Sequence, residues 1–287
     1  MYHNGYNKLW NRSVIVPHIV RKQSIMHQKS ILTHITEVDN PMKDKLIKSL
    51  TSALSHPSCT VPYDIKHYFD TMYNTDVVDA DSNILSFGPL IHCDNKIEKN
   101  ISDLYVRSCY KELYDTCIAK YQCPHVFVTG TSGIGISVFR SYVVWRQIQD
   151  AKHHQQSCII LMSKSNHKCR SPTLLLVIVD GVIILTKSFI GTNKCLDIDL
   201  ILEDVENKMP IYHHVDVTDG ISSTDAHGMK RNYYYTDPNM NAWKEAGKSR
   251  LSCVLFYLPT WTLNELIDFY LKIGWKDNRA LINIHIV

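Results

Sequence analysis

Apolar residues change their spacing near residue 120 of this chain. Before that point they recur at helical intervals, and this pattern predicts helices over residues 41–55, 63–72 and 102–121. Residues 1–36 are polar, rich in His and Lys and only weakly patterned, so we expect them to be a poorly ordered lead-in. The region 37–119 is therefore expected to be mainly helical.

Beyond residue 120, short apolar runs alternate with helical stretches, a pattern typical of β-α units around a mostly parallel sheet. Helices are expected over 138–149, 197–208 and 263–273. The predicted strands cover residues 126–129, 158–162, 174–179, 182–185, 211–217, 233–236 and 253–257. Asp180-Gly181, between the third and fourth of these, is a strong hairpin signal. The prediction is an α/β domain over 120–262, followed by a truncated helical end over 263–287.

A glycine-rich turn follows the strand at 126–129 and precedes the helix at 138–149. It reads Gly130-Thr131-Ser132-Gly133-Ile134-Gly135-Ile136-Ser137. Gly130, Gly135 and Ser137 stand where the phosphate-binding loop G-x-x-x-x-G-K-[ST] requires them. Backbone amides and a helix N-terminus form an anion site there, and the Ser137 hydroxyl suits Mg²⁺. Ile136 replaces the lysine, so we expect weak phosphate binding and a larger loss of hydrolysis, because the lysine stabilises charge that grows in the transition state.

Several alternatives stay open at this loop. Arg140, one helical turn on, is either a solvated arginine or a substitute for the missing lysine. The stretch from Thr129 to Gly135 is one residue short of the T-G-x-x-x-G-I-G of short-chain dehydrogenases, and none of the 16 tyrosines has a lysine four places on. Those enzymes need a Tyr-x-x-x-Lys pair, so its absence disfavours a dehydrogenase. A glycine turn that binds no ligand is the third alternative.

A phosphate-binding loop needs a carboxylate on a neighbouring strand to hold the metal ion or its water. Asp180 follows an apolar run but is better explained as part of the hairpin turn. Asp216 and Asp219 close the strand at 211–217, and a helix predicted just before that strand favours a parallel position in the sheet. We choose Asp219 first and Asp216 second, with a solvated loop carboxylate as the alternative for either.

Composition limits the class of protein. The chain has 287 residues, a formal net charge of +3, and apolar and charged fractions of 45% and 21%, which are globular values. The charge is evenly spread, which argues against a dedicated nucleic-acid surface. Nine cysteines without a C-x-x-C pair indicate reduced thiols in an intracellular compartment, cytoplasmic or nuclear. No signal peptide is visible, and the longest apolar run, 174–179, is too short to span a membrane.

Five segments follow one another along residues 103–270. They are Tyr105-Val106-Arg107-Ser108-Cys109-Tyr110-Lys111-Glu112-Leu113-Tyr114, then Val128-Thr129-Gly130-Thr131-Ser132-Gly133-Ile134-Gly135, then Asp219-Gly220, then Asp237-Pro238-Asn239, then Leu258-Pro259-Thr260-Trp261-Thr262-Leu263-Asn264-Glu265-Leu266. In order and spacing this set resembles the P-loop module of the Crinkler and retrotransposon-hot-spot proteins. Ile136, Ser132 and Asp237 depart from the lysine, proline and serine usual in that module.

The resemblance implies a P-loop NTPase of the AAA/STAND type that binds ATP with Mg²⁺. It implies that loop residues 130–137 contact phosphate, that Ser137 and Asp219 hold Mg²⁺, and that Asn239 senses the γ-phosphate. It also implies an effector-like protein, often acting in the nucleus or in a host cell, that assembles with itself or with related P-loop proteins.

Two functions are consistent with these residues. The first is a nucleotide-binding module whose hydrolysis is weak or lost. The second is a catalytically dead scaffold that keeps the fold without a nucleotide. Asp219 facing Ser137 across an open pocket would favour the first, and Ile136 turned inward against apolar neighbours would favour the second.

Overall fold

The computed structural model describes fourteen stretches of the chain. These are residues 44–45, 48–49, 52, 63–75, 83–86, 90–91, 97–98, 103–118, 123–131, 133–165, 172–190, 209–217, 231–236 and 253–273. The expected lead-in at 1–36 and the expected helix at 197–208 lie outside them. Within the helix expected at 41–55, the described residues 44, 45, 48, 49 and 52 are helical.

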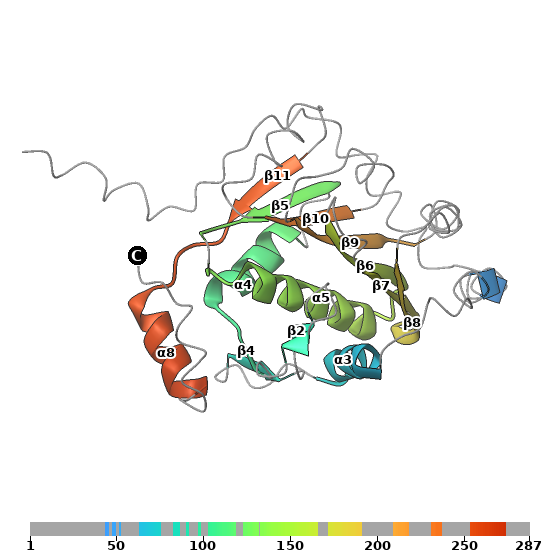
Figure 1. Cartoon of the computed structure of the whole chain (residues 1–287), viewed down its shortest axis with the longest axis horizontal. Helices are drawn as coiled ribbons and strands as arrows, with labels where there is room; N and C mark the ends of the chain where they lie inside the picture. Colours follow the sequence, from blue (N-terminus) through green and yellow to red (C-terminus); the bar gives the residue numbers. More distant parts are fainter. Residues whose placement is uncertain are drawn as a thin grey trace, which may run out of the picture.

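A seven-stranded sheet forms the centre of the protein (Figure 1). Its spatial order is β11 (Cys253–Tyr257), β5 (His125–Thr129), β10 (Arg231–Thr236), β9 (Ile211–Val217), β6 (Cys158–Ser165), β7 (Pro172–Val179) and β8 (Val182–Ile190). The first five strands are parallel, and β7 and β8 are antiparallel additions. The predicted α/β class with a mostly parallel sheet is confirmed, and every predicted strand is present.

The β7–β8 connection is the two-residue hairpin that Asp180-Gly181 predicts. The two residues have φ of 50° and 76°, as a type I′ turn requires. An added Cβ on Gly181 would lie 3.0 Å from Lys152 O, so the turn packs closely against the end of a helix. Asp180 is a turn residue and takes no place at the carboxyl edge of the parallel strands.

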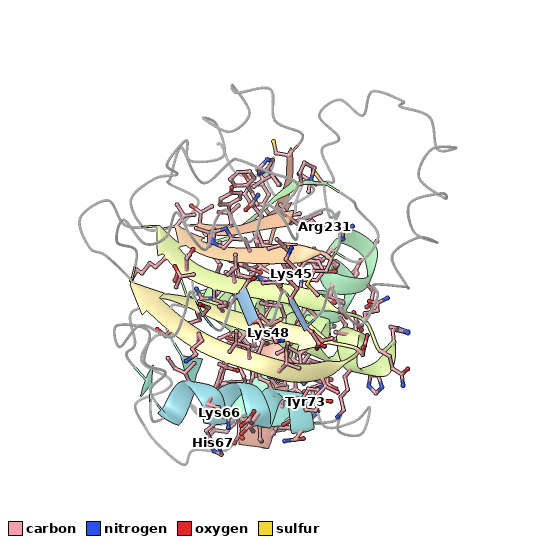
Figure 2. The ribbon with its side chains drawn as sticks, turned by 90° about the vertical axis from the view of Figure 1, so that its right-hand side faces the viewer. Lys45, Lys48, Lys66, His67, Tyr73 and Arg231 are labelled. Atoms are coloured by element: carbon pink, nitrogen blue, oxygen red, sulfur yellow. The ribbon has the colours of Figure 1, made fainter. Side chains whose placement is uncertain are left out.

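Three helices cover one face of the sheet (Figure 1). They are α5 (Ile136–His153), α3 (Tyr63–Asn74) and α4 (Ser108–Leu113), which continues as a π-helical turn over Tyr114–Ile118. A single core joins these helices to the strands, with Tyr110, Phe139 and Tyr142 among its aromatic members. Figure 2 shows α3 below the sheet, with Lys66 and His67 on that helix and Arg231 several strands away.

The prediction of a helix over 102–121 was wrong at its start. Residues Asp103–Tyr105 form strand β4, which pairs antiparallel with β1 (Ile84–Ser86), and the helix begins only at Ser108. A second short pair joins β2 (Leu90–Ile91) and β3 (Ile97–Glu98). The region before residue 120 therefore carries strands as well as helices, because pairing with a distant segment overrides the local helical spacing.

The sheet is buried on its other face as well. Phe127, Val215, Val217 and Tyr234 form a second apolar cluster there, and the rings of Phe127 and Tyr234 stack with centroids 4.7 Å apart. Burial on both faces explains why all five residues of β5 are buried and why its centre, Val126 to Val128, is apolar.

Strand β5 lies where the strand order reverses. Helix α5 leads from β5 across β10 and β9 to β6, whereas β11 lies on the opposite side of β5. In open α/β sheets, ligands bind outside the carboxyl ends of the strands at such a reversal. The glycine loop leaves β5 at this end of the sheet.

The last described helix, α8 (Leu263–Ile273), has the bounds that the sequence predicts. Its start is a capping box, in which the Glu265 N–H donates to Thr262 Oγ1 at 3.2 Å and the Thr262 N–H donates to Glu265 Oε2 at 3.0 Å. Among the described helices, none is long and apolar enough to cross a membrane.

Candidate functional site: the glycine loop and its supports

The loop begins with a glycine that has no room for a side chain. An added Cβ on Gly130 would lie 2.8 Å from Ile134 Cγ2 and 3.3 Å from Leu258 Cβ. Ile134 is buried beneath the turn, and its N–H donates to Thr131 O at 3.1 Å. The loop is therefore folded around the buried Ile134 side chain, and its first position has room only for glycine.

The end of the loop leaves the N-terminus of α5 without a capping side chain. Gly133 and Gly135 have φ of 79° and 94°, and Gly135 is the N-cap residue. The first backbone bond of the helix runs from Phe139 N to Gly135 O at 2.8 Å. The N–H groups of Ile136, Ser137 and Val138 therefore have no acceptor within the helix. Three amides without a helical acceptor, at the positive end of an 18-residue helix, are suited to an anion.

Two side chains of the α4 segment hold the carbonyl groups of the loop from behind. Arg107 Nη1 donates to Ile134 O at 3.4 Å, and the Tyr110 hydroxyl donates to Gly135 O at 3.1 Å. An added Cβ on Gly135 would lie 2.5 Å from that hydroxyl. Both contacts lie on the core side of the loop, so the carbonyl groups of Ile134 and Gly135 point toward the core.

Arg107 also binds the start of α8. Its guanidinium reaches Glu265 at 3.3 Å (Nε–Oε1) and 3.1 Å (Nη2–Oε2), donates to Thr260 O at 2.9 Å, and lies 4.5 Å from the centre of the Trp261 ring. Partial burial alone would raise the pKa of Glu265, but hydrogen bonds from Arg107 and Thr262 bring it below the ordinary value. Glu265 is thus held as a carboxylate opposite a buried cation.

Tyr105 completes this assembly, which we call the support cluster: Tyr105, Arg107, Trp261, Glu265 and Asp268. The Tyr105 ring stacks on Trp261 with centroids 5.9 Å apart, and its hydroxyl donates to Asp268 Oδ2 at 2.6 Å. That hydrogen bond holds the pKa of Asp268 below its usual value, and burial together with Asp268 raises the pKa of Tyr105. Three of the five segments that carry the family resemblance therefore meet around the loop.

The position of the missing lysine is filled by an apolar side chain. Ile136 is half-buried and packs against the main core. This inward packing is what the scaffold hypothesis predicts. Ser137 is half-buried, Thr131 is exposed, and Ser132 lies outside the described residues.

Arg140 is neither solvated nor free to replace the lysine, so both expectations for it were wrong. Its side chain is 1% exposed, and Nη1 lies 3.2 Å from Asp216 Oδ2. Asp216, the second-choice metal ligand, is thus paired with a buried guanidinium. The pair fastens α5 to β9.

A buried histidine lies beside this ion pair. His214 Nε2 is 2.8 Å from Gln147 Oε1, and Nδ1 is 2.9 Å from the Tyr235 hydroxyl. Because an amide oxygen only accepts, Nε2 carries the proton and the Tyr235 hydroxyl donates to Nδ1. Burial lowers the pKa of His214 well below its ordinary value, with Arg140 and His213 adding to the effect. The helix–sheet contact is therefore built around a neutral imidazole.

The remaining predicted site residues, Asp219 and Asn239, lie outside the described residues. Among the residues that are described, no three His, Cys, Asp or Glu side chains are grouped so that they could hold a metal ion. Thr129, directly before the loop, has a buried hydroxyl with no hydrogen-bond partner among the described residues. A ligand oxygen or an ordered water at the carboxyl edge of β5 would satisfy such a group.

Sequence reasoning gave no role to Arg107, Tyr110 and Glu265, although all three lie in segments quoted for the resemblance. A detectable signal was present for two of them. Thr262 and Glu265 form the spacing of a capping box, and Arg107 interrupts a stretch of aromatic and apolar residues. Their contact with the loop depends on the tertiary fold and has no local signature.

Comparison with known proteins adds little at this point. No protein-family model and no curated protein matches the chain. Among solved structures, a Bacteroides thetaiotaomicron protein, described as having an actin-like ATPase fold and unknown function, is similar over 75% of this chain and 70% of its own. The identity is 9% and the TM-score 0.20, so this likeness carries no argument about fold or function.

Proposed function

We propose that this chain is a P-loop-type module of the Crinkler kind, which binds ATP or another nucleotide through its loop amides and hydrolyses it weakly or not at all. The observation that carries the proposal is the uncapped N-terminus of α5 at the carboxyl end of β5, with three amides free of helical acceptors. Tetrahedral phosphate oxygens are acceptors of the right charge for such a site.

The order of the parallel strands supports this class. One strand, β10, lies between the loop strand β5 and the strand β9 that carries Asp216. This order, with β11 on the far side of β5, is typical of the AAA/STAND type of P-loop ATPase that the resemblance implies. The end of β9 is then the expected origin of the metal-holding acid, which we assign to Asp219.

The charges around the loop support weak or absent hydrolysis. Ile136 brings no charge, and the two buried cations nearest the loop, Arg107 and Arg140, are each paired with a carboxylate. Neither arginine then adds net positive charge opposite the growing charge of a phosphoryl-transfer transition state, which the backbone dipoles of the loop and Mg²⁺ would face. Mg²⁺ held by Ser137 and Asp219, and a sensing role for Asn239, complete the proposal.

A second function is favoured by one specific observation. Ile136 packs against the main core, as it would in a scaffold that keeps the fold without a ligand. In that case the uncapped amides bind water, and the protein acts through its surfaces, with related P-loop proteins or host proteins as partners.

Titration with a fluorescent ATP analogue and Mg²⁺ separates these functions. The wild-type protein is compared with Ile136→Lys and with a control, Val138→Lys, which adds the same charge two positions on. We expect micromolar binding by the wild type, and at least about tenfold tighter binding by Ile136→Lys alone, since a factor of ten needs only about 1.4 kcal/mol. Binding by Ile136→Lys without binding by the wild type would favour the scaffold. If neither protein binds, the loop is not a phosphate site.

A further inference from the structure

One buried side chain joins the loop to the C-terminal helix. Arg107 contacts Ile134 O in the loop, Thr260 O after β11, and Glu265 in the first turn of α8. Arg107 and Glu265 are 158 positions apart in sequence, and the Arg107 side chain has an exposed fraction of 0%. The guanidinium is therefore fixed from several sides at once.

The contacts behind the loop set the direction of its amides. In a trans peptide, the carbonyl of one residue and the N–H of the next point to opposite sides. Because Ile134 O is turned toward Arg107, the Gly135 N–H is turned away from it. Because Gly135 O is turned toward Tyr110, the same holds for the Ile136 N–H. Two consecutive amides are thus directed away from the core, to the side where an anion would bind.

The orientation of the guanidinium depends in turn on α8. Glu265 binds Arg107 through both carboxylate oxygens and takes part in the capping box with Thr262. The Trp261 ring, directly before the cap, lies against the guanidinium face. Displacement of the first turn of α8 would remove both of these constraints on Arg107.

Among the described residues, helix α8 meets the rest of the protein through Glu265, which binds Arg107, and through Asp268 and Phe269, which meet Tyr105. Leu263 and Leu271 are 72% and 73% exposed. Elements with few buried contacts open at lower free energy than the core, so α8 is a part of the fold that can move while the sheet stays intact.

We propose that Arg107 is a positioning residue for the loop amides and that, through the Arg107–Glu265 ion pair, helix α8 controls how strongly the loop binds a phosphate group. This inference rests on the proposed nucleotide-binding function. Binding at the loop and docking of α8 then reinforce each other, because each stabilises the same orientation of the guanidinium.

The test compares two carboxyl-to-amide changes on α8. Glu265→Gln removes the charge that faces Arg107 but keeps the capping box, which accepts Gln at this position. Asp268→Asn, the matched control, changes a carboxylate one turn away that binds Tyr105 and Lys272. Affinity for the fluorescent ATP analogue with Mg²⁺, and hydrogen exchange at the Gly135 and Ile136 amides without ligand, are measured on the full chain. Urea unfolding corrects the exchange rates for any global loss of stability.

Glu265→Gln is expected to weaken binding by about fivefold or more and to speed exchange at the loop amides by a similar factor. Asp268→Asn keeps an oxygen that accepts from the Tyr105 hydroxyl, so it should have a clearly smaller effect on both. Equal effects of the two variants, or unchanged loop exchange in Glu265→Gln, would overturn the proposal. If the wild type binds no analogue, the nucleotide function fails, and the exchange rates alone then decide whether Arg107 positions the loop.

Discussion

Two buried arginines, one in contact with the glycine loop and one in the helix that follows it, are bound differently. Arg107 and Arg140 are each 1% exposed and each paired with a carboxylate. Arg107 also donates to two backbone carbonyls, one of them in the loop. Arg140 lies in α5, where it is paired with Asp216 on β9. The first cation shapes a loop, and the second joins a helix to a strand.

The comparison explains why charge near a glycine loop is a poor guide to phosphate binding. A buried cation is costly unless a carboxylate accompanies it, and that carboxylate cancels the charge that a phosphate would feel. At this loop both nearby cations are neutralised in this way. Within the part of the chain that the structure describes, the amides of the loop and of the first turn of α5 then supply the attraction for an anion.

Removal of the Asp216 carboxylate should give the largest effect. Asp216→Ala removes the carboxylate that is paired with the buried Arg140, and we expect a loss of about 3–5 kcal/mol in the free energy of unfolding, measured in urea. The control is Asp115→Ala, which breaks the exposed pair between Asp115 and Arg146 on the same helix. An exposed pair contributes at most about 1 kcal/mol.

A loss of under 1 kcal/mol in Asp216→Ala would show that Arg140 is solvated in solution. In that case Arg140 would again be a candidate to replace the missing lysine, and the two arginines would no longer differ in the way described above.

The surroundings of the two arginines should also affect stability at different pH: His214 lies near Arg140, and Glu265 binds Arg107. The pKa of His214 lies well below its unfolded value, mainly because the ring is buried, so the unfolded state takes up a proton first as pH falls below about 6.5. We expect the free energy of unfolding to fall there by at most about 1.4 kcal/mol per pH unit. The pKa of Glu265 is lowered from about 4.5, so its contribution is fully present above that value and is lost only in more acid solution.

His214→Gln isolates the contribution of His214 to the pH dependence of the free energy of unfolding. Between pH 7 and 5 the variant should show a flatter dependence of stability on pH than the wild type, since His125, the other buried histidine among the described residues, titrates in both proteins. Parallel curves for the two proteins would mean that His214 is protonated in the folded state. Thermal unfolding across this range provides the measurement.

The sequence predicted those parts of the fold whose signals are local. The centre of strand β5, Val126 to Val128, is apolar because both faces of the strand are buried. Helix α8 begins after Thr262 because a capping residue precedes an amphipathic stretch. Two of the three glycines with positive φ in the described residues, Gly133 and Gly135, also lie within the loop that the motif indicates. Periodicity, caps and turn residues are properties of neighbours in the chain.

The contacts that shape the loop are long-range, so local sequence signals do not indicate them. The Arg140–Asp216 pair and the Arg107–Glu265 pair join residues far apart in sequence, so no local spacing indicates them. Strand β4 has three residues and forms only because β1 lies beside it. Such features follow from the completed fold, and the roles of Asp219, Asn239 and Ser137 stay predictions for the same reason.

The smallest effect should come from the second support of the loop. Tyr110→Phe removes the hydroxyl that donates to Gly135 O, but this carbonyl keeps its bond from Phe139 N at 2.8 Å. No buried acceptor is left without a partner, so we expect a loss of about 0.5–1 kcal/mol in urea unfolding. Because the Ile134 carbonyl stays bound to Arg107, binding of the ATP analogue should weaken less than in Glu265→Gln. A larger loss of binding in Tyr110→Phe would mean that the hydroxyl, and not the guanidinium, holds the amides in place.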